Sequence, residues 1–197
     1  GSRAEKAHLV FAQTDGLPHD IPGLLRATVA ALGACSGTSD GDAAELPPLL
    51  TGDQLGDGWV ASDPGEVALL PGTVAPPCPF DGEIPDVELV AADSIEFGDE
   101  ARRLGINHTV VAFGGEADTA DAVLATWMTM DCSGSDADQR PVDGLPAGVF
   151  GVELDTIDSD FTQAVLVRVD GPTMSFLVVT GNGPETIDIA RDLAPLV

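Results

Sequence analysis

The sequence predicts an α+β fold, a mainly antiparallel twisted sheet with helices packed on one face, containing two similar β-α-Cys units. Three observations lead to this prediction. Strand-like runs follow one another along the chain, amphipathic helix patterns lie between some of them, and one strand–helix–cysteine order occurs twice. With 197 residues, 44% of them hydrophobic, the chain is long enough to bury a core.

The charge balance is strongly acidic, with 8 Lys and Arg against 33 Asp and Glu and a formal net charge of −25. Such a surface repels phosphate backbones and anionic headgroups, which argues against nucleic acid and membrane surfaces as partners. A cationic ligand or a basic protein surface remains compatible, and so does a simple role in solubility. No stretch approaches the roughly 20 apolar residues that span a bilayer, so we expect no membrane insertion by this segment.

The repeated order begins with two β-type runs, His8–Ala12 and His108–Phe113. Each run is followed by a glycine-containing turn and then by apolar residues at the i, i+3, i+4, i+7 spacing of a helix that buries one face. These apolar positions are Ile21, Leu24, Leu25, Thr28 and Leu32 in the first copy, and Ala120, Val123, Leu124, Trp127 and Met130 in the second.

Both helices end near a cysteine, Cys35 or Cys132, that is followed by Ser-Gly and an Asp-rich tail. We therefore predict an internal duplication whose two copies form a pseudo-symmetric pair. Residues 1–45 are predicted to be an N-terminal β-α unit, or the tail of a preceding repeated domain. Residues 46–197 are predicted to be the main α+β domain, with the two parts packed as one globule.

The remaining elements follow in order. A helical turn is expected at Thr51–Leu55, a strand around Gly58–Val60, and mostly loop in the Pro- and Gly-rich stretch 64–85. Residues 97–104 fit neither pattern clearly. Further strands are predicted at Val87–Ala92, Gly148–Leu154, Thr162–Val169 and Thr173–Thr180, with a hairpin turn at Asp170-Gly171-Pro172 and a last helix from Pro184 to about Leu193.

The stretch from Leu49 to Trp59, Leu-Leu-Thr-Gly-Asp-Gln-Leu-Gly-Asp-Gly-Trp, resembles the opening of the actinobacterial PknH-like extracellular sensor domain, which also occurs in sensor-domain lipoproteins. Further features follow in the family's order: Cys78 after a proline-rich loop, Phe113 ending a strand, Trp127 in a helix, Asp131-Cys132, Arg168 in a strand pair, and a last helix. The resemblance covers roughly residues 46–197, and residues 1–45 depart from it. It implies an extracytoplasmic, disulfide-stabilised sheet with helices around a cleft, ligand binding, and no catalysis.

The chain contains three cysteines, an odd number. The family's spacing favours a Cys78–Cys132 disulfide with Cys35 free or bonded to a partner. If the duplication is real, Cys35 could instead pair with Cys132. Leu32-Gly33-Ala34-Cys35 also matches a lipoprotein cleavage site, although the apolar run before it is short.

Catalytic and metal-binding patterns are weak, so we expect no enzyme activity, no metal and no cofactor. Gly33–Gly37 matches the small-residue frame of a nucleophile elbow, but here a helix precedes the cysteine where the elbow needs a strand. The runs Asp40-Gly41-Asp42 and Asp136-Ala137-Asp138 alternate carboxylates as calcium loops do, yet neither extends to a twelve-residue EF-hand. A solvated acidic loop explains both.

The residues we single out for ligand contact are Arg168, Arg102, Arg103 and Trp59. In a cleft, the scarce arginines could meet an anionic group of a ligand, whereas Trp59 and Trp127 fit a core role better than a ligand platform. The leading hypothesis is an extracytoplasmic, non-enzymatic sensor-type domain that binds a small molecule, an envelope component or a basic protein surface. The alternative is a structural or protein-interaction lipoprotein domain without a ligand pocket.

Overall fold

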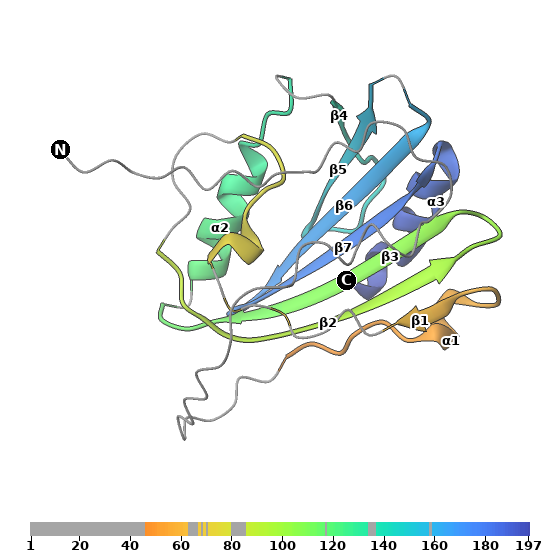
Figure 1. Ribbon diagram of the computed structural model, residues 1–197. Coiled ribbons are helices and arrows are strands. Elements are labelled where there is room, and N and C mark those ends of the chain that lie inside the picture. Colours follow the sequence, from red (N-terminus) through yellow and green to blue (C-terminus); the bar gives the residue numbers. More distant parts are fainter. Residues whose placement is uncertain are drawn as a thin grey trace. The chain divides into compact units, whose positions relative to one another are not determined.

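The computed structural model describes residues 46–62, 67, 69, 71–79, 86–116, 118–133, 137–157 and 159–197. They form a seven-stranded antiparallel sheet in the order β1-β2-β3-β7-β6-β5-β4, with a few helices, which confirms the α+β class (Figure 1). The strands are β1 (Val60–Ser62), β2 (Leu89–Asp99), β3 (Leu104–Phe113), β4 (Ala137–Pro141), β5 (Val149–Thr156), β6 (Phe161–Asp170) and β7 (Thr173–Asn182). The helices are α1 (Gly52–Leu55), α2 (Thr119–Met128) and α3 (Pro184–Leu193), with 3-10 turns η3 (Pro71–Val74) and η4 (Ala194–Leu196).

The predicted hairpin turn joins the two central strands β6 and β7. Asp170 pairs with Thr173, and Gly171 between them has a φ of 56°, a left-handed conformation that glycine adopts without steric cost. The pairing then continues without a bulge as far as Phe161 and Asn182. Long, regular pairing of this kind makes the middle of the sheet a rigid base for the helices.

Successive residues of β6 and β7 enter two separate cores, one on each face of the sheet. Val165 and Val167 pack in the same core as α2, whereas Ala164 and Leu166 pack in the same core as α3. The prediction that the helices pack on one face is therefore wrong, because α2 and α3 cover opposite faces. The physical reason is that both central strands are apolar at consecutive positions, and a strand of that kind must be covered on both sides.

The core on the side of α2, here called the α2 face, contains one large aromatic anchor. Trp127 is 4% exposed, and its indole Nε1–H donates a hydrogen bond of 2.8 Å to the carbonyl oxygen of Val74 in η3. Its ring lies 5.4 Å from that of Phe176 on β7, in a tilted arrangement that aromatic pairs favour. Trp127 thus links α2 to both η3 and the sheet, in the core role predicted for it.

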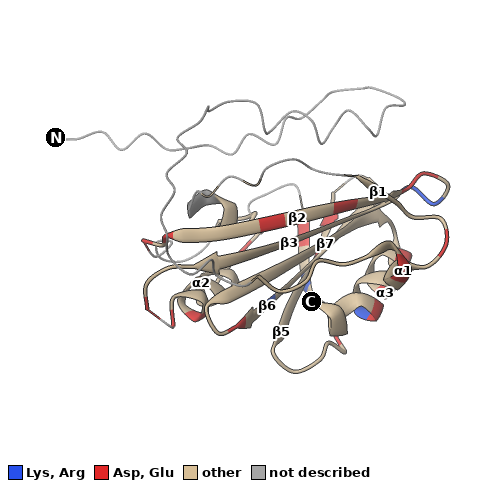
Figure 2. Ribbon diagram, turned by 90° about the horizontal axis from the view of Figure 1, so that it is seen from below, with Lys and Arg blue, Asp and Glu red and all other residues tan. Residues whose placement is uncertain are grey.

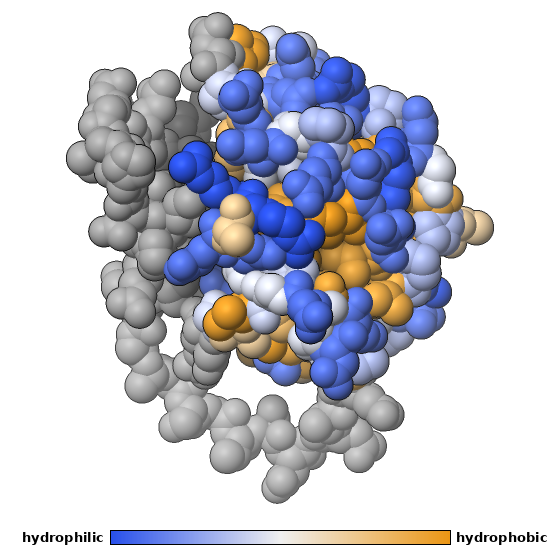
Figure 3. All heavy atoms as spheres, turned by 90° about the vertical axis from the view of Figure 1, so that its right-hand side faces the viewer, coloured by the Kyte–Doolittle hydropathy of each residue, from blue (hydrophilic) through white to orange (hydrophobic). Residues whose placement is uncertain are grey.

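The core on the opposite side, the α3 face, is closed by the helix that directly follows β7. Gly183, with a φ of 70°, turns the chain, and Pro184 begins α3 at the position where a missing N–H costs nothing. Ile187, Ala190 and Leu193 then pack on the sheet. Figure 3 views the molecule from the side on which α1, β1 and α3 lie in Figure 1, and there apolar side chains form a strip enclosed by hydrophilic ones.

Negative charge predominates in the described part of the chain. It contains five arginines, no lysine, and many carboxylates, which Figure 2 shows along the strands, helices and loops. No helix among the described residues is both long enough and apolar enough to cross a membrane.

Two differences from the predicted elements concern the strands. Residues 97–104, ambiguous in sequence, form the end of β2, a turn and the start of β3, so both strands are longer than predicted. Strand β4 was not predicted, because its sequence Ala-Asp-Gln-Arg-Pro is polar and continues an Asp-rich stretch.

The first predicted β-α-Cys unit lies outside the described residues, so the duplication stays a prediction. The second unit is visible as β3, α2 and Cys132. The chain divides into two units, residues 1–40 and 41–197, and the described residues all belong to the second. The predicted packing of residues 1–45 against the remainder likewise stays a prediction.

Candidate functional site

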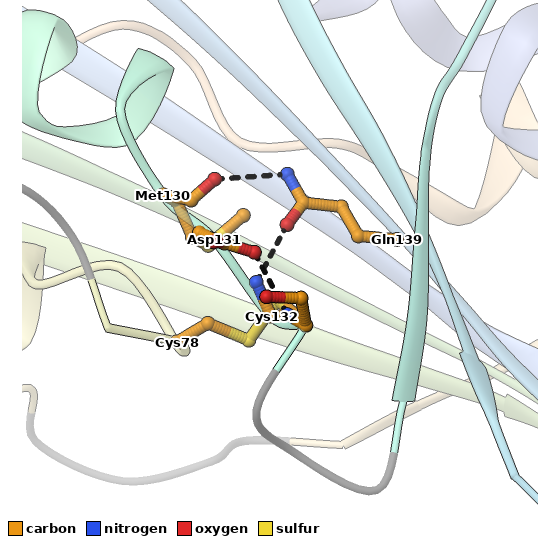
Figure 4. The surroundings of a disulfide bond; sticks show 6 residues. Cys78, Met130, Asp131, Cys132 and Gln139 are labelled. Carbon is orange, nitrogen blue, oxygen red and sulfur yellow. Dashed lines mark hydrogen bonds between the residues drawn. A yellow bond between two sulfur atoms is a disulfide. The ribbon is translucent and has the colours of Figure 1, made fainter.

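A disulfide joins Cys78 and Cys132, as the family resemblance implied (Figure 4). It connects the segment after η3 to the segment after α2, and Cys132 is fully buried. Beside it, the backbone N–H of Asp131 donates to the carbonyl oxygen of Pro79 at 2.8 Å. The chain that leaves α2 is therefore fixed by a covalent bond and by a backbone hydrogen bond.

The same segment is held from the other side by Gln139 of β4 (Figure 4). The Gln139 side chain accepts a hydrogen bond from the N–H of Cys132 at 2.9 Å and donates one to the carbonyl oxygen of Met130 at 3.1 Å. Asp131 accepts from the N–H of Ser133 at 2.8 Å, and the hydrogen bonds from Ser133 lower the pKa of that carboxyl. One amide side chain thus satisfies two backbone groups and sets the spacing between β4 and the end of α2.

A shallow hollow of about 440 Å³ lies between this segment and β4, and we call it the α2–β4 groove. Its apolar lining comes from Met128, Met130, Phe150 and Val152, and its polar lining includes Asp131 and Gln139. Ligand sites in proteins commonly combine an apolar surface with a few polar groups in a volume of this order. Met128 is 66% exposed, and methionine side chains adapt easily to different ligand shapes.

The charges around the groove are mostly negative. Arg140 lies in the lining, but its guanidinium pairs with Glu153, at 2.9 Å, and with Asp155. The attraction of these two carboxylates, that of Glu153 first, raises the pKa of Arg140 above its ordinary value. The register pairs Arg140 with Glu153 and Asp138 with Asp155, so these side chains point to the α3 face, opposite to Val152 and Leu154 of the α2 core. Asp131 is the carboxylate that lines the groove on the α2 face. The groove therefore suits a ligand that carries an apolar group and a positive charge.

Two of the predicted ligand residues, Arg102 and Trp59, lie together at the turn between β2 and β3. The Arg102 guanidinium is 5.2 Å from the centre of the Trp59 ring, within the range of a cation–π contact. Its Nε donates to the Asp99 carboxylate at 2.7 Å, and the backbone N–H of Arg102 donates to the same carboxylate at 3.0 Å. The side-chain hydrogen bond from Arg102 is the main cause that lowers the pKa of Asp99.

Gly58 leaves the space that the Asp99 carboxylate occupies. A Cβ atom at Gly58 would lie 2.9 Å from the Asp99 carboxylate, and its φ of 98° also disfavours other residues. Asp99 is only 4% exposed, so Arg102 is the partner that makes its burial tolerable. Arg102 therefore has a structural role within this chain, as the partner of the Asp99 carboxylate.

The other two predicted ligand residues lie elsewhere. Arg103 is in the same turn, with a φ of 57°. Arg168 is on β6 opposite Ser175, and its guanidinium donates to the carbonyl oxygen of Val197 at 3.0 Å. Ser175 in turn pairs with Val110 on β3, whereas Arg102 precedes the start of that strand. The structure thus brings Arg102 and Trp59 together and places Arg168 towards the opposite end of β3; ligand binding by all four residues stays a prediction.

His108 is the one histidine among the described residues, and it is buried on the α3 face. Its Nδ1 accepts a hydrogen bond from the backbone N–H of Leu50 at 3.0 Å, and burial lowers its pKa to about 4. The ring is therefore neutral at pH 7 and joins the segment before α1 to the sheet. In the part of the chain that the structure describes, no three His, Cys, Asp or Glu side chains converge as metal ligands would.

Comparisons with known proteins point to a distant structural similarity. No protein-family model matches the chain, and no curated protein matches it. Among solved structures, it is similar to the solution structure of cyanobacterial PsbP (CyanoP) from Synechocystis sp. PCC 6803, at 15% sequence identity and a TM-score of 0.36. The match covers 84% of this chain and 96% of the other. A similarity at this level assigns neither a family nor a function to the chain.

Proposed function

We propose that this chain is an extracytoplasmic, non-enzymatic binding domain of the sensor type in a cell-envelope protein, and that its ligand binds in the α2–β4 groove. The observation that carries the proposal is the groove itself, with four large apolar side chains, a polar lining and a covalently fixed border. The Cys78–Cys132 disulfide supports a location outside the cytoplasm, because such bonds persist in oxidising compartments.

The border of the groove supports binding more strongly than its size does. A binding surface holds its ligand well only if its own groups are already in position, since ordering them on binding costs free energy. Here the segment after α2 is held by the disulfide, by the Pro79 carbonyl and by the Gln139 side chain. These contacts hold the border of the groove in position without a ligand.

The second candidate is a protein-interaction domain that works by surface contact without a ligand pocket. The exposed side chain of Val60 favours it, because this residue is 71% exposed on the short strand β1 at the other edge of the sheet. A contact surface of this kind would be a contiguous exposed apolar patch, and Val60 would be one member of it. The two candidates therefore place the functional surface at opposite edges.

Methyl NMR on the methionines distinguishes the two candidates, using a panel of small amphiphilic amines as probes. The chain has three methionines: Met128 and Met130 line the groove, and Met174 is fully buried and serves as an internal control. We expect members of the panel to shift the Met128 and Met130 methyl signals in a saturable way and to leave Met174 unchanged. If no member shifts Met128 or Met130, the groove is not a ligand site.

Two matched variants locate the effect. Met128→Lys and Val60→Lys each place a positive charge at an exposed apolar position, one in the groove and one on β1. Met128→Lys should abolish the shift of the Met130 methyl, because it fills the groove with a charge of the same sign as the probe. Val60→Lys should leave that shift unchanged. Equal loss of the shift in both variants would contradict the assignment of the site to the groove.

A further inference from the structure

Strand β4 is the last strand of the sheet on the side of the groove. Among the described residues, its sheet partner is β5 alone, through the pairs from Ala137 and Thr156 to Pro141 and Val152. Asp138, Gln139, Arg140 and Pro141 are all exposed, and all five residues of β4 belong to the groove lining. An open strand edge and an apolar groove therefore lie side by side.

The register shows which backbone groups of β4 point away from the sheet. The N–H of Val142 donates to the carbonyl oxygen of Gly151 at 3.1 Å, so the position after β4 faces β5. In an antiparallel pair, residues that face the partner strand alternate with residues whose backbone groups face outward. The outward positions are therefore Ala137, Gln139 and Pro141. Proline is compatible with such a position, because it has no N–H that would need a partner there.

An extended peptide can use this edge in the way that strand-binding domains use theirs. Backbone hydrogen bonds to an open edge give affinity, and alternate side chains enter pockets beside it. Along β4, the outward N–H and C=O of Gln139 and the outward C=O of Ala137 and Pro141 are available in register. On one face of the added strand, alternate side chains would meet Met128, Met130 and Phe150.

The charge of the surroundings decides which peptide fits. Asp138, Glu153 and Asp155 lie around the Arg140 guanidinium on the α3 face of the β4–β5 pair. Asp131 lines the groove on the α2 face. The described residues near β4 therefore carry an excess of negative charge on both faces. A second copy of this chain is disfavoured as the occupant, because each copy has a formal net charge of −25. A basic segment meets no such repulsion.

We propose that the outer edge of β4 binds an extended, basic peptide segment of a partner protein as an eighth strand, with alternate apolar side chains in the α2–β4 groove. The inference rests on the proposed function, because it uses the same groove. It adds the partner's chemical class, its backbone conformation and its direction of approach.

The test uses three fluorescein-labelled heptapeptides and measures binding by fluorescence anisotropy. The first alternates lysine and leucine, the second has the same sequence with N-methyl groups on alternate backbone nitrogens, and the third has glutamate in place of lysine. We expect the first to bind. N-methylation should weaken binding by about tenfold or more, because it removes the N–H donors of the added strand, and the glutamate peptide should show no binding.

Variants test the charges at the edge. Asp131→Asn with Asp138→Asn should weaken the lysine peptide roughly five- to tenfold at low salt, with a smaller effect at high salt. Asp57→Asn with Asp86→Asn removes two exposed carboxylates outside the groove and should have little effect. Equal weakening by both pairs would overturn the assignment to β4, since it would show attraction to the overall charge alone.

The outcomes separate this inference from the proposed function. If the N-methylated peptide binds as tightly as the first while Met128 and Met130 shift, strand addition is wrong and the groove remains a ligand site. If the peptides leave both methyl signals unchanged while the amine panel shifts them, the peptide partner is wrong and the proposed function stands. If neither peptides nor amines shift them, both fail.

Discussion

The two faces of the sheet are closed in different ways. On the α3 face, the covering helix follows β7 after one residue, Gly183, so its position is set by a short connection. On the α2 face, the covering helix depends on contacts between distant parts of the chain. Trp127 donates to Val74, 53 residues away, and Cys132 bonds to Cys78, 54 residues away.

This difference shows why the candidate site belongs to the α2 face. Helix α3 also has remote contacts, from Arg191 to the carbonyl oxygen of Asp143 and from Arg102 to Glu185, but these are exposed and non-covalent. The remote contacts of α2 are a buried hydrogen bond and a disulfide, and the segment that carries Cys132 forms the edge of the groove. We therefore expect perturbation of the two faces to have different consequences, and the predictions below are ordered from the largest expected effect to the smallest.

Removal of the disulfide by the double change Cys78→Ser and Cys132→Ser should lower the free energy of unfolding by roughly 4 kcal/mol, because the chain-entropy model assigns a cost of that size to a loop of this length. Denaturant unfolding under non-reducing conditions measures the change. Cys35→Ser, which leaves the Cys78–Cys132 bond intact, is the control. A loss below about 1 kcal/mol would show that the α2 face does not depend on the bond.

Protonation of His108 on the α3 face should lower the free energy of unfolding in acid. Its pKa is lowered to about 4 in the folded protein from an ordinary value of 6.5, so between these two pH values the unfolded chain binds a proton that the folded chain does not. The free energy of unfolding should therefore fall by roughly 3 kcal/mol as the pH drops from 6.5 to 4.

Unfolding at several pH values measures this dependence against His108→Gln, whose side chain can still accept a hydrogen bond from Leu50 but does not titrate in this range. Effects of the carboxylates, including Asp99, are common to both proteins and cancel in the comparison. Parallel pH profiles for the two proteins would contradict the assignment to His108.

Replacement of Trp127 by phenylalanine should lower the free energy of unfolding by about 1–2 kcal/mol, because it removes the hydrogen bond to Val74 and leaves that carbonyl oxygen without this donor. Thermal or denaturant unfolding measures the loss. Phe176→Leu is a useful comparison, since it alters the same aromatic pair while it retains the hydrogen bond. If Trp127→Phe is neutral, the contact with η3 does not stabilise α2.

Replacement of Thr186 by valine should have the smallest effect and the opposite sign. The Thr186 hydroxyl is fully buried on the α3 face and has no hydrogen-bond partner among the described residues. An apolar side chain of similar shape should raise the free energy of unfolding by about 1 kcal/mol. Thr186→Ser retains the hydroxyl and should show no gain; a loss of stability in the valine variant would reveal a partner for this hydroxyl.

The strands of the fold could be predicted well where the sequence is apolar and regular. The runs 162–169 and 173–180, the turn between them and the helix from Pro184 were all expected, because strong β-type runs, a turn signal and a proline at a helix start act locally. The placement of the helices was not predicted correctly. The signal was present in β6, where Ala164 to Val167 are consecutively apolar and therefore need cover on both faces.

The candidate site was harder to predict because its parts meet only in three dimensions. The Cys78–Cys132 pair followed from a resemblance, but β4 is a polar edge strand whose propensity is weak and whose formation depends on pairing with β5. Met128 was outside the apolar helix pattern, and its 66% exposure beside a groove is a tertiary property. We singled out arginines as ligand residues because they are scarce, yet Arg102 and Arg140 form ion pairs with acidic side chains of this chain.

The central claim is that a disulfide and a buried hydrogen bond between remote segments hold the α2 face, and with it the groove, whereas α3 is held by its short connection to β7 and by non-covalent contacts. Hydrogen exchange of the oxidised and the reduced protein tests this claim most directly. The account predicts that reduction accelerates exchange in α2 and in the segment 129–133 and leaves α3 protected. Equal acceleration in both helices, or none in α2, would contradict it.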